Sequence, residues 1–283
     1  MLFSSKPKTT TTKTTTTNTT RASSDKKRAL CTGINDYIGT QNDLRGCVND
    51  ARGWGSMLKD VYGFRVITLL DKQANHSAFT EAMGNMIADS RAGDSLVVTY
   101  SGHGTHTPDK NGDESDGRDE ALCLYDGLLI DDAIRDMFKN LHPDATLTFI
   151  SDSCHSGTVT RAFVSLMHNE DAPRPRYMPP EDDTEAFSTR GSDVKNRIFY
   201  PEEGMNEILI SGCLPTEYSY DARLGGKYWG AMSYHALNIL RKQPTITYEN
   251  FYAKLRKDLP SSNYPQSPCL EGSDDNKKRI MFA

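Results

Sequence analysis

The sequence lacks three features that would each narrow its function. It has no apolar run near the roughly 20 residues of a membrane span, and its first residues, MLFSSKPK, have no apolar core like that of a secretory signal. Its six cysteines are widely spread without close pairs, which suits a reducing compartment. Lys and Arg (33) do not exceed Asp and Glu (38), so the formal net charge of −5 argues against a nucleic-acid partner. We therefore expect a cytoplasmic protein with free thiols and no membrane span.

Apolar residues are also scarce, at 36%, and the deficit is uneven along the chain. Residues 9–20 contain ten threonines, so residues 1–26 are predicted to be a disordered tail. Residues 161–204 include the run APRPRYMPPEDD and little periodic apolar pattern, which predicts an exposed, mobile insert. The remaining chain, 27–160 and 205–283, can still bury a sizeable core.

Strand-like and helix-like segments alternate along this remaining chain. The run SLVVTY (95–100) is typical of a strand buried on both faces, and Asn75 is a candidate N-cap for the helix that follows it. The predicted strands are 28–34, 65–70, 95–100, 146–151, 206–212 and 279–283. The predicted helices are 47–59, 75–90, 131–140, 230–240 and 248–259. This alternation predicts an α/β fold with a mainly parallel sheet and helices on both faces.

Two of the predicted strands end in reactive side chains, SGHG (101–104) and DSCHSG (152–157). Ligands bind beyond the carboxyl ends of parallel strands, so His103 and Cys154 would face each other if the two strands are neighbours. The imidazole would take the thiol proton, the thiolate would attack an acyl carbon, and the backbone amides of Cys154 and Gly104 would hold the oxyanion. This chemistry requires no cofactor. A third residue to orient the histidine is not evident.

Metal sites are the alternatives for these residue types. A zinc site could use His103, His106, Cys154 and His155, but the close spacing of such sites, as in CxxC, is absent. The acidic loop 109–120 nearly fits an EF-hand, yet Glu114 stands where the sharp turn requires Gly, which excludes that motif. The other cysteines are predicted to be core residues.

The two loop motifs, 51 residues apart from His to Cys, resemble those of the caspase-fold cysteine peptidases, and among them the metacaspases and bacterial orthocaspases. The runs GINDY, LRGCVNDA (44–51), LLIDDAI (128–134) and QSPCLEGS (266–273) agree with this resemblance. It implies a caspase-like three-layer α/β/α sandwich around a mainly parallel six-stranded sheet. It also implies one peptidase domain over 27–283, with a large-subunit-like part (27–160) and a small-subunit-like part (205–283).

The resemblance also implies a pocket for the substrate residue before the cleaved bond. Asp152 stands two residues before Cys154, so in an extended segment both side chains point to the same side. The family pattern adds Asp50, with Cys47 and Ser101 lining the pocket. Two carboxylates favour Arg or Lys in the substrate, and Arg can form two parallel hydrogen bonds. The alternative for Asp50 is a carboxylate on a helix surface.

The expected activity is therefore hydrolysis of peptides and proteins after Arg or Lys, with self-cleavage in the insert 161–204 and a monomeric enzyme. The resemblance implies calcium as a possible activator, bound by Asp119, Asp131 and Asp132. Arg161 stands where a fourth acidic ligand is expected, and Asp131 could instead cap its helix. Two other functions stay open: a scaffold or partner-binding protein with an idle Cys–His pair, and a peptidase of the same fold that is specific for another residue such as Asp.

Overall fold

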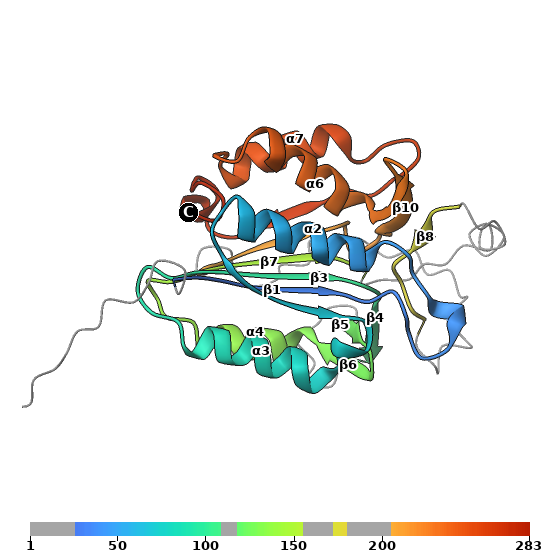
Figure 1. The fold of residues 1–283 in the computed structure, drawn as a ribbon, viewed down its shortest axis with the longest axis horizontal. Helices are drawn as coiled ribbons and strands as arrows, with labels where there is room; N and C mark the ends of the chain where they lie inside the picture. The colour runs from blue at the N-terminus through green and yellow to red at the C-terminus, as the bar shows by residue number, and fades with distance from the viewer. Residues whose placement is uncertain (1–25, 109–117, 155–171, 180–204) are drawn as a thin grey trace, which may run out of the picture.

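The computed structural model of the protein describes residues 26–108, 118–154, 172–179 and 205–283. These ranges form a sheet between two layers of helices (Figure 1). The Thr-rich tail predicted at 1–26 lies outside them except for its last residue. Of the insert predicted at 161–204, only residues 172–179 lie inside them.

A six-stranded sheet forms the centre of the described part. Its order is β12-β9-β7-β3-β1-β2, and only the edge strand β12 runs antiparallel to its neighbour. All seven residues of β3 are buried, as the continuous apolar run predicts. The six strands are β1 (Lys27–Gly33), β2 (Arg65–Leu70), β3 (Ser95–Ser101), β7 (Thr146–Asp152), β9 (Glu207–Ser211) and β12 (Cys269–Glu271).

Helices cover both faces of this sheet (Figure 1). One face carries α2 (Cys47–Asp60), α6 (Ala231–Lys242) and α7 (Tyr248–Asp258), and the other carries α3 (His76–Ala88) and α4 (Asp131–Phe138). The arrangement confirms the predicted three-layer α/β/α sandwich. The other described helices are short turns: η1 (Thr40–Asn42), η2 (Asp71–Gln73) and α8 (Asp274–Lys277).

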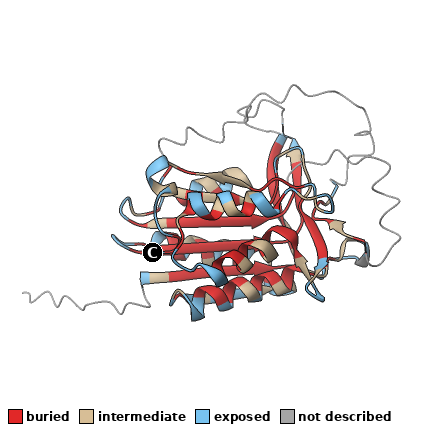
Figure 2. Cartoon of the chain, turned by 90° about the horizontal axis from the view of Figure 1, so that it is seen from above, coloured by how far each residue is buried: buried red, intermediate tan, exposed pale blue. Residues whose placement is uncertain are grey.

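Two hydrophobic clusters fill the space between the layers, and the inner faces of the helices are buried with them (Figure 2). Trp54 of α2 lies in one cluster, and its Nε1 donates to the Ser233 hydroxyl of α6 at 3.2 Å. Phe79 of α3 and Tyr100 of β3 meet edge to face in the other. Each large side chain so buried stabilises the fold by about 1.5–3 kcal/mol. The two clusters therefore hold the sheet as a rigid base for the loops at its ends.

Two small antiparallel sheets lie beyond the carboxyl ends of the central strands, and the sequence pattern did not predict them. One contains β4 (Gly104–Pro108), β5 (Arg118–Leu124) and β6 (Gly127–Ile130). The other contains β8 (Arg174–Pro175), β10 (Tyr220–Leu224) and β11 (Lys227–Gly230). Five of these strands are two to five residues long, too short for an apolar alternation to stand out, and the seven-residue β5 begins with the charged run Arg118, Asp119 and Glu120.

The strand predicted at 279–283 is wrong. Met281 and Phe282 are buried, but Ile280 forms only an isolated bridge with Thr247, and the sixth strand of the sheet is β12. The apolar run is buried through side-chain packing, since the Phe282 ring meets Tyr248 edge to face. Burial alone does not distinguish such a packed turn from a strand.

The exposed insert predicted at 161–204 is also wrong for its described residues. Within 172–179, Ala172 and the run Pro175 to Tyr177 are buried, and Arg176 is 0% exposed. A loop-like composition, rich in Pro and Arg, conceals a segment that packs against the body of the protein.

Candidate active site

The central sheet brings His103 and Cys154 to the same edge. Strands β3 and β7 are parallel neighbours, with Ser101 opposite Asp152 in their register. His103 follows Ser101 by two residues, and Cys154 follows Asp152 by two. Both side chains therefore lie just beyond the carboxyl ends of adjacent strands, where ligands bind in sheets of this kind.

The surroundings of His103 determine which of its nitrogens can accept a proton. Its Nε2 lies 2.7 Å from the carbonyl oxygen of Asn42, which can only accept, so Nε2 carries the hydrogen. The other nitrogen, Nδ1, is buried and has no hydrogen-bond partner among the described residues. Burial lowers the pKa of His103 to about 4, and the nearby Arg176 charge acts in the same direction. At neutral pH, His103 is thus an uncharged base whose Nδ1 is the available acceptor. Asn42 is the orienting group that the sequence did not reveal.

The His103 loop is held tightly by two tyrosines. The Tyr37 hydroxyl accepts from the His103 backbone N–H at 2.7 Å, and the Tyr100 hydroxyl donates to the His103 carbonyl oxygen at 2.7 Å. A side chain at Gly102 would collide with both hydroxyls. The glycine of the SGHG run is therefore required by this close approach.

The Cys154 side chain is fully buried, against the residue that precedes β10. The Ser219 backbone N–H donates to Sγ at 2.8 Å, and the thiol donates to the Ser219 carbonyl oxygen at 3.3 Å. Cys213, Tyr177 and Tyr218 pack around the thiol in a small apolar cluster. The thiol is therefore placed by the backbone of a distant part of the chain.

Residues 172–179 of the chain itself cross this site. Strand β8 pairs antiparallel with β10, and the Arg176 N–H donates to the Ser219 carbonyl oxygen at 2.9 Å. The Arg176 carbonyl oxygen accepts from the backbone N–H groups of Cys154, at 3.1 Å, and Gly104, at 3.0 Å. These are the two amides that the sequence predicts as oxyanion donors, and they converge on one carbonyl oxygen. Two such donors polarise a carbonyl and stabilise the negative charge that develops on its oxygen.

The Arg176 side chain lies in a fully buried pocket of carboxylates. Its Nη2 donates to Asp50 at 2.6 Å and to Asp221 at 3.2 Å. Its Nη1 donates to the Asp152 carbonyl oxygen at 2.9 Å and lies 3.4 Å from the Asp152 carboxylate. The two ends of the guanidinium thus contact different acids, an arrangement that the single ammonium of Lys cannot reproduce.

Backbone and hydroxyl groups hold the acids in place. Asp50 accepts from the Gly230 N–H at 3.0 Å, and Asp152 accepts from the Ser233 N–H at 2.9 Å and from the Ser219 hydroxyl. Asp221 accepts from the Gly46 N–H at 2.7 Å. Because their remaining oxygens are satisfied in this way, and because Arg45 Nε lies 3.9 Å from the Asp221 carboxylate, three carboxylates can be buried around Arg176.

The charge balance of the pocket shifts the titration of its members. Burial raises the pKa of Asp50 to about 7; Arg176 opposes this shift and Asp152 adds to it. Burial also raises the pKa of the Cys47 thiol well above its usual value. Asp50 is therefore the pocket acid whose charge changes near neutral pH.

Two glycines give the pocket its depth. A Cβ at Gly230 would collide with the Asp152 carboxylate and the Arg176 guanidinium, and a Cβ at Gly46 would collide with the Asp221 carboxylate. Both backbones lie directly against charged groups, so these positions exclude any side chain.

The structure brings together all of the pocket residues that the sequence predicts. Asp50, Asp152, Cys47 and Ser101 are buried at this edge, and the interpretation of Asp50 as a surface carboxylate is wrong, since it is 0% exposed. Sequence reasoning missed Asp221, Ser219 and Gln266. The Gln266 amide accepts from the Tyr220 N–H at 3.0 Å and donates to the Gly212 carbonyl oxygen at 2.8 Å. Its place in the QSPCLEGS run was the only signal for any of the three.

Two of the three residues predicted to bind calcium lie close to a cation on their own helix. Asp131 lies 2.7 Å and Asp132 lies 3.7 Å from Arg135 on the same helix. Within the ranges that the structure describes, no group of three or more His, Cys, Asp or Glu is arranged to hold a metal ion. Arg161 and His155, which entered the calcium and zinc hypotheses, lie outside the described residues. The calcium site at Asp119, Asp131 and Asp132 stays a prediction.

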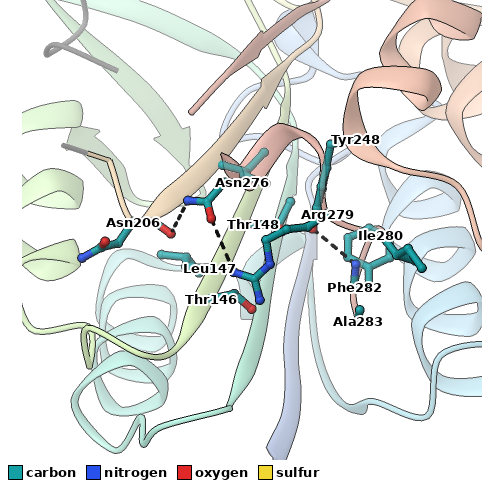
Figure 3. Close-up of a pocket in the computed structure, with 11 residues that line it drawn as sticks. Thr146, Leu147, Thr148, Asn206, Tyr248, Asn276, Arg279, Ile280, Phe282 and Ala283 are labelled. Atoms are coloured by element: carbon teal, nitrogen blue, oxygen red, sulfur yellow. Dashed lines mark hydrogen bonds between the residues drawn. The ribbon is translucent and has the colours of Figure 1, made fainter. Parts of the chain in front are cut away.

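A second hollow lies at the opposite end of the sheet (Figure 3). Thr146 to Thr148, the first residues of β7, line it, whereas Cys154 stands two residues after the end of that strand. Seven residues of strand put the two places on the order of 20 Å apart. Arg279 donates to the Asn276 side chain at 3.4 Å across this hollow, and no cysteine or histidine lines it. It is a structural feature of the C-terminal segment and not part of the site.

Comparisons with known proteins agree with this geometry. Residues 27–162 match the family model of the metacaspase, peptidase C14 domain. Metacaspase-1 of Debaryomyces hansenii is 32% identical over 90% of this chain and 67% of its own length. Metacaspase-1 of Candida glabrata is 32% identical over 91% of this chain and 75% of its own length.

Solved structures show the same fold. A protein of Geobacter sulfurreducens superposes with a TM-score of 0.68 at 27% identity, over 91% of this chain and 98% of that one. Caspase-1 of Spodoptera frugiperda superposes with a TM-score of 0.53 at 13% identity, over 87% of this chain and 84% of that one. Fold and relatives together define a caspase-fold cysteine peptidase. Within that class, the chain belongs to the metacaspase family.

Proposed function

We propose that the protein is an endopeptidase that cleaves peptide bonds after Arg, and after Lys less efficiently, through Cys154 and His103. The observation that carries this proposal is the chain's own Arg176, whose side chain fills the carboxylate pocket while its carbonyl oxygen accepts from the Cys154 and Gly104 amides. A substrate residue bound in this way has its carbonyl carbon beside the thiol.

The reaction uses groups of this chain only. His103 Nδ1 takes the proton of the Cys154 thiol, and the thiolate attacks the carbonyl carbon. The amides of Cys154 and Gly104 hold the oxyanion until the C–N bond breaks and the imidazolium protonates the leaving amine. Water, deprotonated by His103, then hydrolyses the thioester and releases the new carboxyl group and the thiol. We accordingly propose that no cofactor is required for the chemistry.

The same geometry supports self-cleavage at one bond, between Arg176 and Tyr177. The insert contains several basic residues, but within the described ranges only Arg176 has its carbonyl oxygen on the two amides. A bond held in the site by its own chain reacts as a unimolecular step, which favours it over cleavage of a separate molecule.

The test compares the purified protein with its Cys154→Ala and Arg176→Ala variants. The protein should yield two fragments, the second beginning at Tyr177, and neither variant should yield that fragment. An Arg-containing quenched peptide should be cleaved by the protein and by Arg176→Ala but not by Cys154→Ala. Cleavage that persists in Cys154→Ala would contradict the assigned nucleophile.

The alternatives make different predictions in the same assay. A scaffold with an idle Cys–His pair would leave every peptide intact although the protein is folded. A peptidase specific for Asp would cleave an Asp peptide faster than the Arg peptide. The three buried carboxylates around Arg176 oppose this second alternative, because an acidic side chain would add a fourth like charge to them.

Calcium, oligomeric state and location are further parts of the proposal. Calcium as an activator predicts faster peptide cleavage at millimolar calcium and no such response in Asp131→Asn. We propose a monomer, because the outer strand β12 has three residues and offers a short edge for pairing. All six cysteines are free thiols, which supports a cytoplasmic location. None of the described helices is long and apolar enough to cross a membrane.

A further inference from the structure

The segment that fills the site also occupies the side beyond the Arg176–Tyr177 bond, the prime side. Tyr177 forms a parallel bridge with Gly104, the first residue of β4, and the Met178 N–H donates to the Gly104 carbonyl oxygen at 3.0 Å. Strand β4 is paired with β5 along its other edge. Pairing between backbones accepts almost any sequence, so selection depends on what surrounds each side chain.

Two rings contact the Tyr177 side chain. The His106 ring of β4 lies nearly parallel to it, at an interplanar angle of 16° with centroids 6.1 Å apart. The Tyr218 ring, from the loop before β10, lies with its centroid 6.3 Å away at an interplanar angle of 59°. The Tyr177 hydroxyl lies 3.3 Å from His106 Nδ1, and the residue is only 6% exposed.

The positions of both rings follow from the elements that bind Arg176. His106 is two residues after Gly104 on β4, so its side chain points to the same side of the strand as that position. Tyr218 precedes Ser219, whose carbonyl oxygen accepts from the Arg176 N–H. Any peptide bound with its scissile carbonyl on the two amides would therefore bring its next side chain between these two rings.

We infer that His106 and Tyr218 form a prime-side subsite that selects an aromatic residue directly after the cleaved bond. The inference rests on the proposed function, because it names a second determinant of the substrate for the same site. A flat ring fills the space between the two rings with favourable offset and tilted contacts. A small side chain leaves those contacts unmade, and a carboxylate loses its hydration against the Tyr218 ring.

The experiment requires an enzyme whose own segment does not compete. The variant carrying both Arg176→Ala and Tyr177→Ala, here the open-site enzyme, removes the two side chains that occupy the pocket and the subsite. Its substrates are quenched peptides that copy residues 172–179 and differ only at the position of Tyr177, which is Tyr, Phe, Ser or Asp. Mass spectrometry identifies the cleaved bond. The kcat/KM for the Tyr and Phe peptides should exceed that for the Ser peptide about tenfold, and Asp should be the poorest.

Two substitutions of Tyr218 locate the effect. Tyr218→Ala in the open-site enzyme should lower the ratio of the Phe to the Ser peptide to about threefold, because the His106 ring remains. Tyr218→Phe keeps the ring and should keep the ratio. If Tyr218→Ala retains the full ratio, the subsite is elsewhere and the inference is overturned.

A second measurement avoids the open-site enzyme, in case that variant does not fold. In the otherwise unchanged chain, Tyr177→Ser should slow self-cleavage about tenfold, whereas Tyr177→Phe should leave its rate within about threefold of the original. Equal rates for Ser and Phe, in self-cleavage or in peptides, would overturn the inference and leave the proposed function intact. Failure of every Arg peptide and of self-cleavage would instead overturn the proposed function, and this inference with it.

Discussion

The two sides of the Arg176–Tyr177 bond are held by different chemistry. Before the bond, a fully buried guanidinium contacts three carboxylates. After the bond, a tyrosine ring lies between a histidine and a second tyrosine. The pocket before the bond recognises the charge of a side chain and the directions of its hydrogen bonds. The rings after the bond recognise the shape of a side chain.

This difference determines how strongly each side discriminates. An unpaired charge in a buried site costs several kcal/mol, whereas a lost aromatic contact costs about 1 kcal/mol beyond the area it buries. The residue before the bond should therefore decide whether a peptide is a substrate at all. The residue after it should rank the substrates that qualify.

The largest expected effect comes from removing one pocket charge. Asp50→Asn at pH 8 should lower kcat/KM for an Arg peptide about 100-fold or more, because breaking a buried ion pair costs about 3 kcal/mol or more. Asp60→Asn, at the exposed end of the same helix, is the matched control and should have little effect. The comparison of the two sides fails if Asp50→Asn costs less than Tyr218→Ala.

A substitution that fills the pocket should have the next largest effect. Gly230→Ala places a methyl group against the Asp152 carboxylate and the Arg guanidinium, and overpacking of this kind costs about 2 kcal/mol, or roughly thirtyfold in kcat/KM. Gly84→Ala, in the middle of α3 with nothing near its Cβ, is the control and should leave kcat/KM unchanged. Steady-state kinetics with one Arg peptide measures both. An unaffected Gly230→Ala enzyme would mean that substrates do not enter this pocket.

Lowering the pH should weaken recognition of the residue before the cleaved bond and leave recognition of the residue after it unchanged. The pKa of Asp50 is raised to about 7 by burial, and a bound Arg opposes that shift, so a basic substrate binds best when Asp50 is ionised. The value of about 7 holds with Arg176 in the pocket, and an empty pocket lacks that opposing charge; as pH falls from 8 to 6, protonation of Asp50 should therefore lower kcat/KM for the Arg peptide at least about tenfold. His103, with a pKa of about 4, stays a neutral base over this range. The charged and titratable groups that surround Asp50 are Arg176, Asp152, Asp221 and Cys47.

Two controls separate Asp50 from other titrating groups. Asp50→Asn should show a flatter profile between pH 6 and 8, because its amide does not ionise. The ratio of the Phe to the Ser peptide should stay constant over the same range, since neither side chain ionises. An unchanged profile in Asp50→Asn would assign the acid limb to another group.

The sequence predicted part of the carboxylate pocket before the cleaved bond and nothing of the aromatic contacts after it. Long strands such as β3 and the helix capped by Asn75 carry local patterns that predict them, and the two loop motifs follow from those strands. Asp221 and Tyr218 belong to a region of short strands, and the Asp221 carboxylate accepts from the Gly46 N–H, 175 positions earlier in the chain. Nothing local in the sequence encodes such a contact.

The segment 172–179 is a second case in which the local sequence pattern does not predict the structure. Pro173 and Pro175 make it resemble an exposed loop, because proline is rare inside strands. Yet β8 is an edge strand, where a missing N–H is tolerated, and its place in the site depends on the body of the protein rather than on its own pattern. Only the distribution of basic residues in the insert pointed towards it.

The smallest expected effect comes from Arg45, which contacts the backbone of the bound segment and not the side chain of Arg176 or Tyr177. Arg45 stacks on the Tyr228 ring at 4.0 Å, and its Nη2 donates to the Ala172 carbonyl oxygen at 3.1 Å, four residues before Arg176. Arg45→Lys should lose both contacts and raise KM about fivefold for peptides that reach the Ala172 position, because each such contact is worth about 0.5–1 kcal/mol. Peptides that begin at the position of Arg174 should change less, because for them only the contact of Arg45 with the Asp221 carboxylate, at 3.9 Å, is affected. A backbone carbonyl is the same in every peptide, so the change in KM should not depend on which residue stands at the position of Ala172. If the change does depend on that side chain, the position is a third selective subsite. The comparison would then extend beyond the two residues at the cleaved bond.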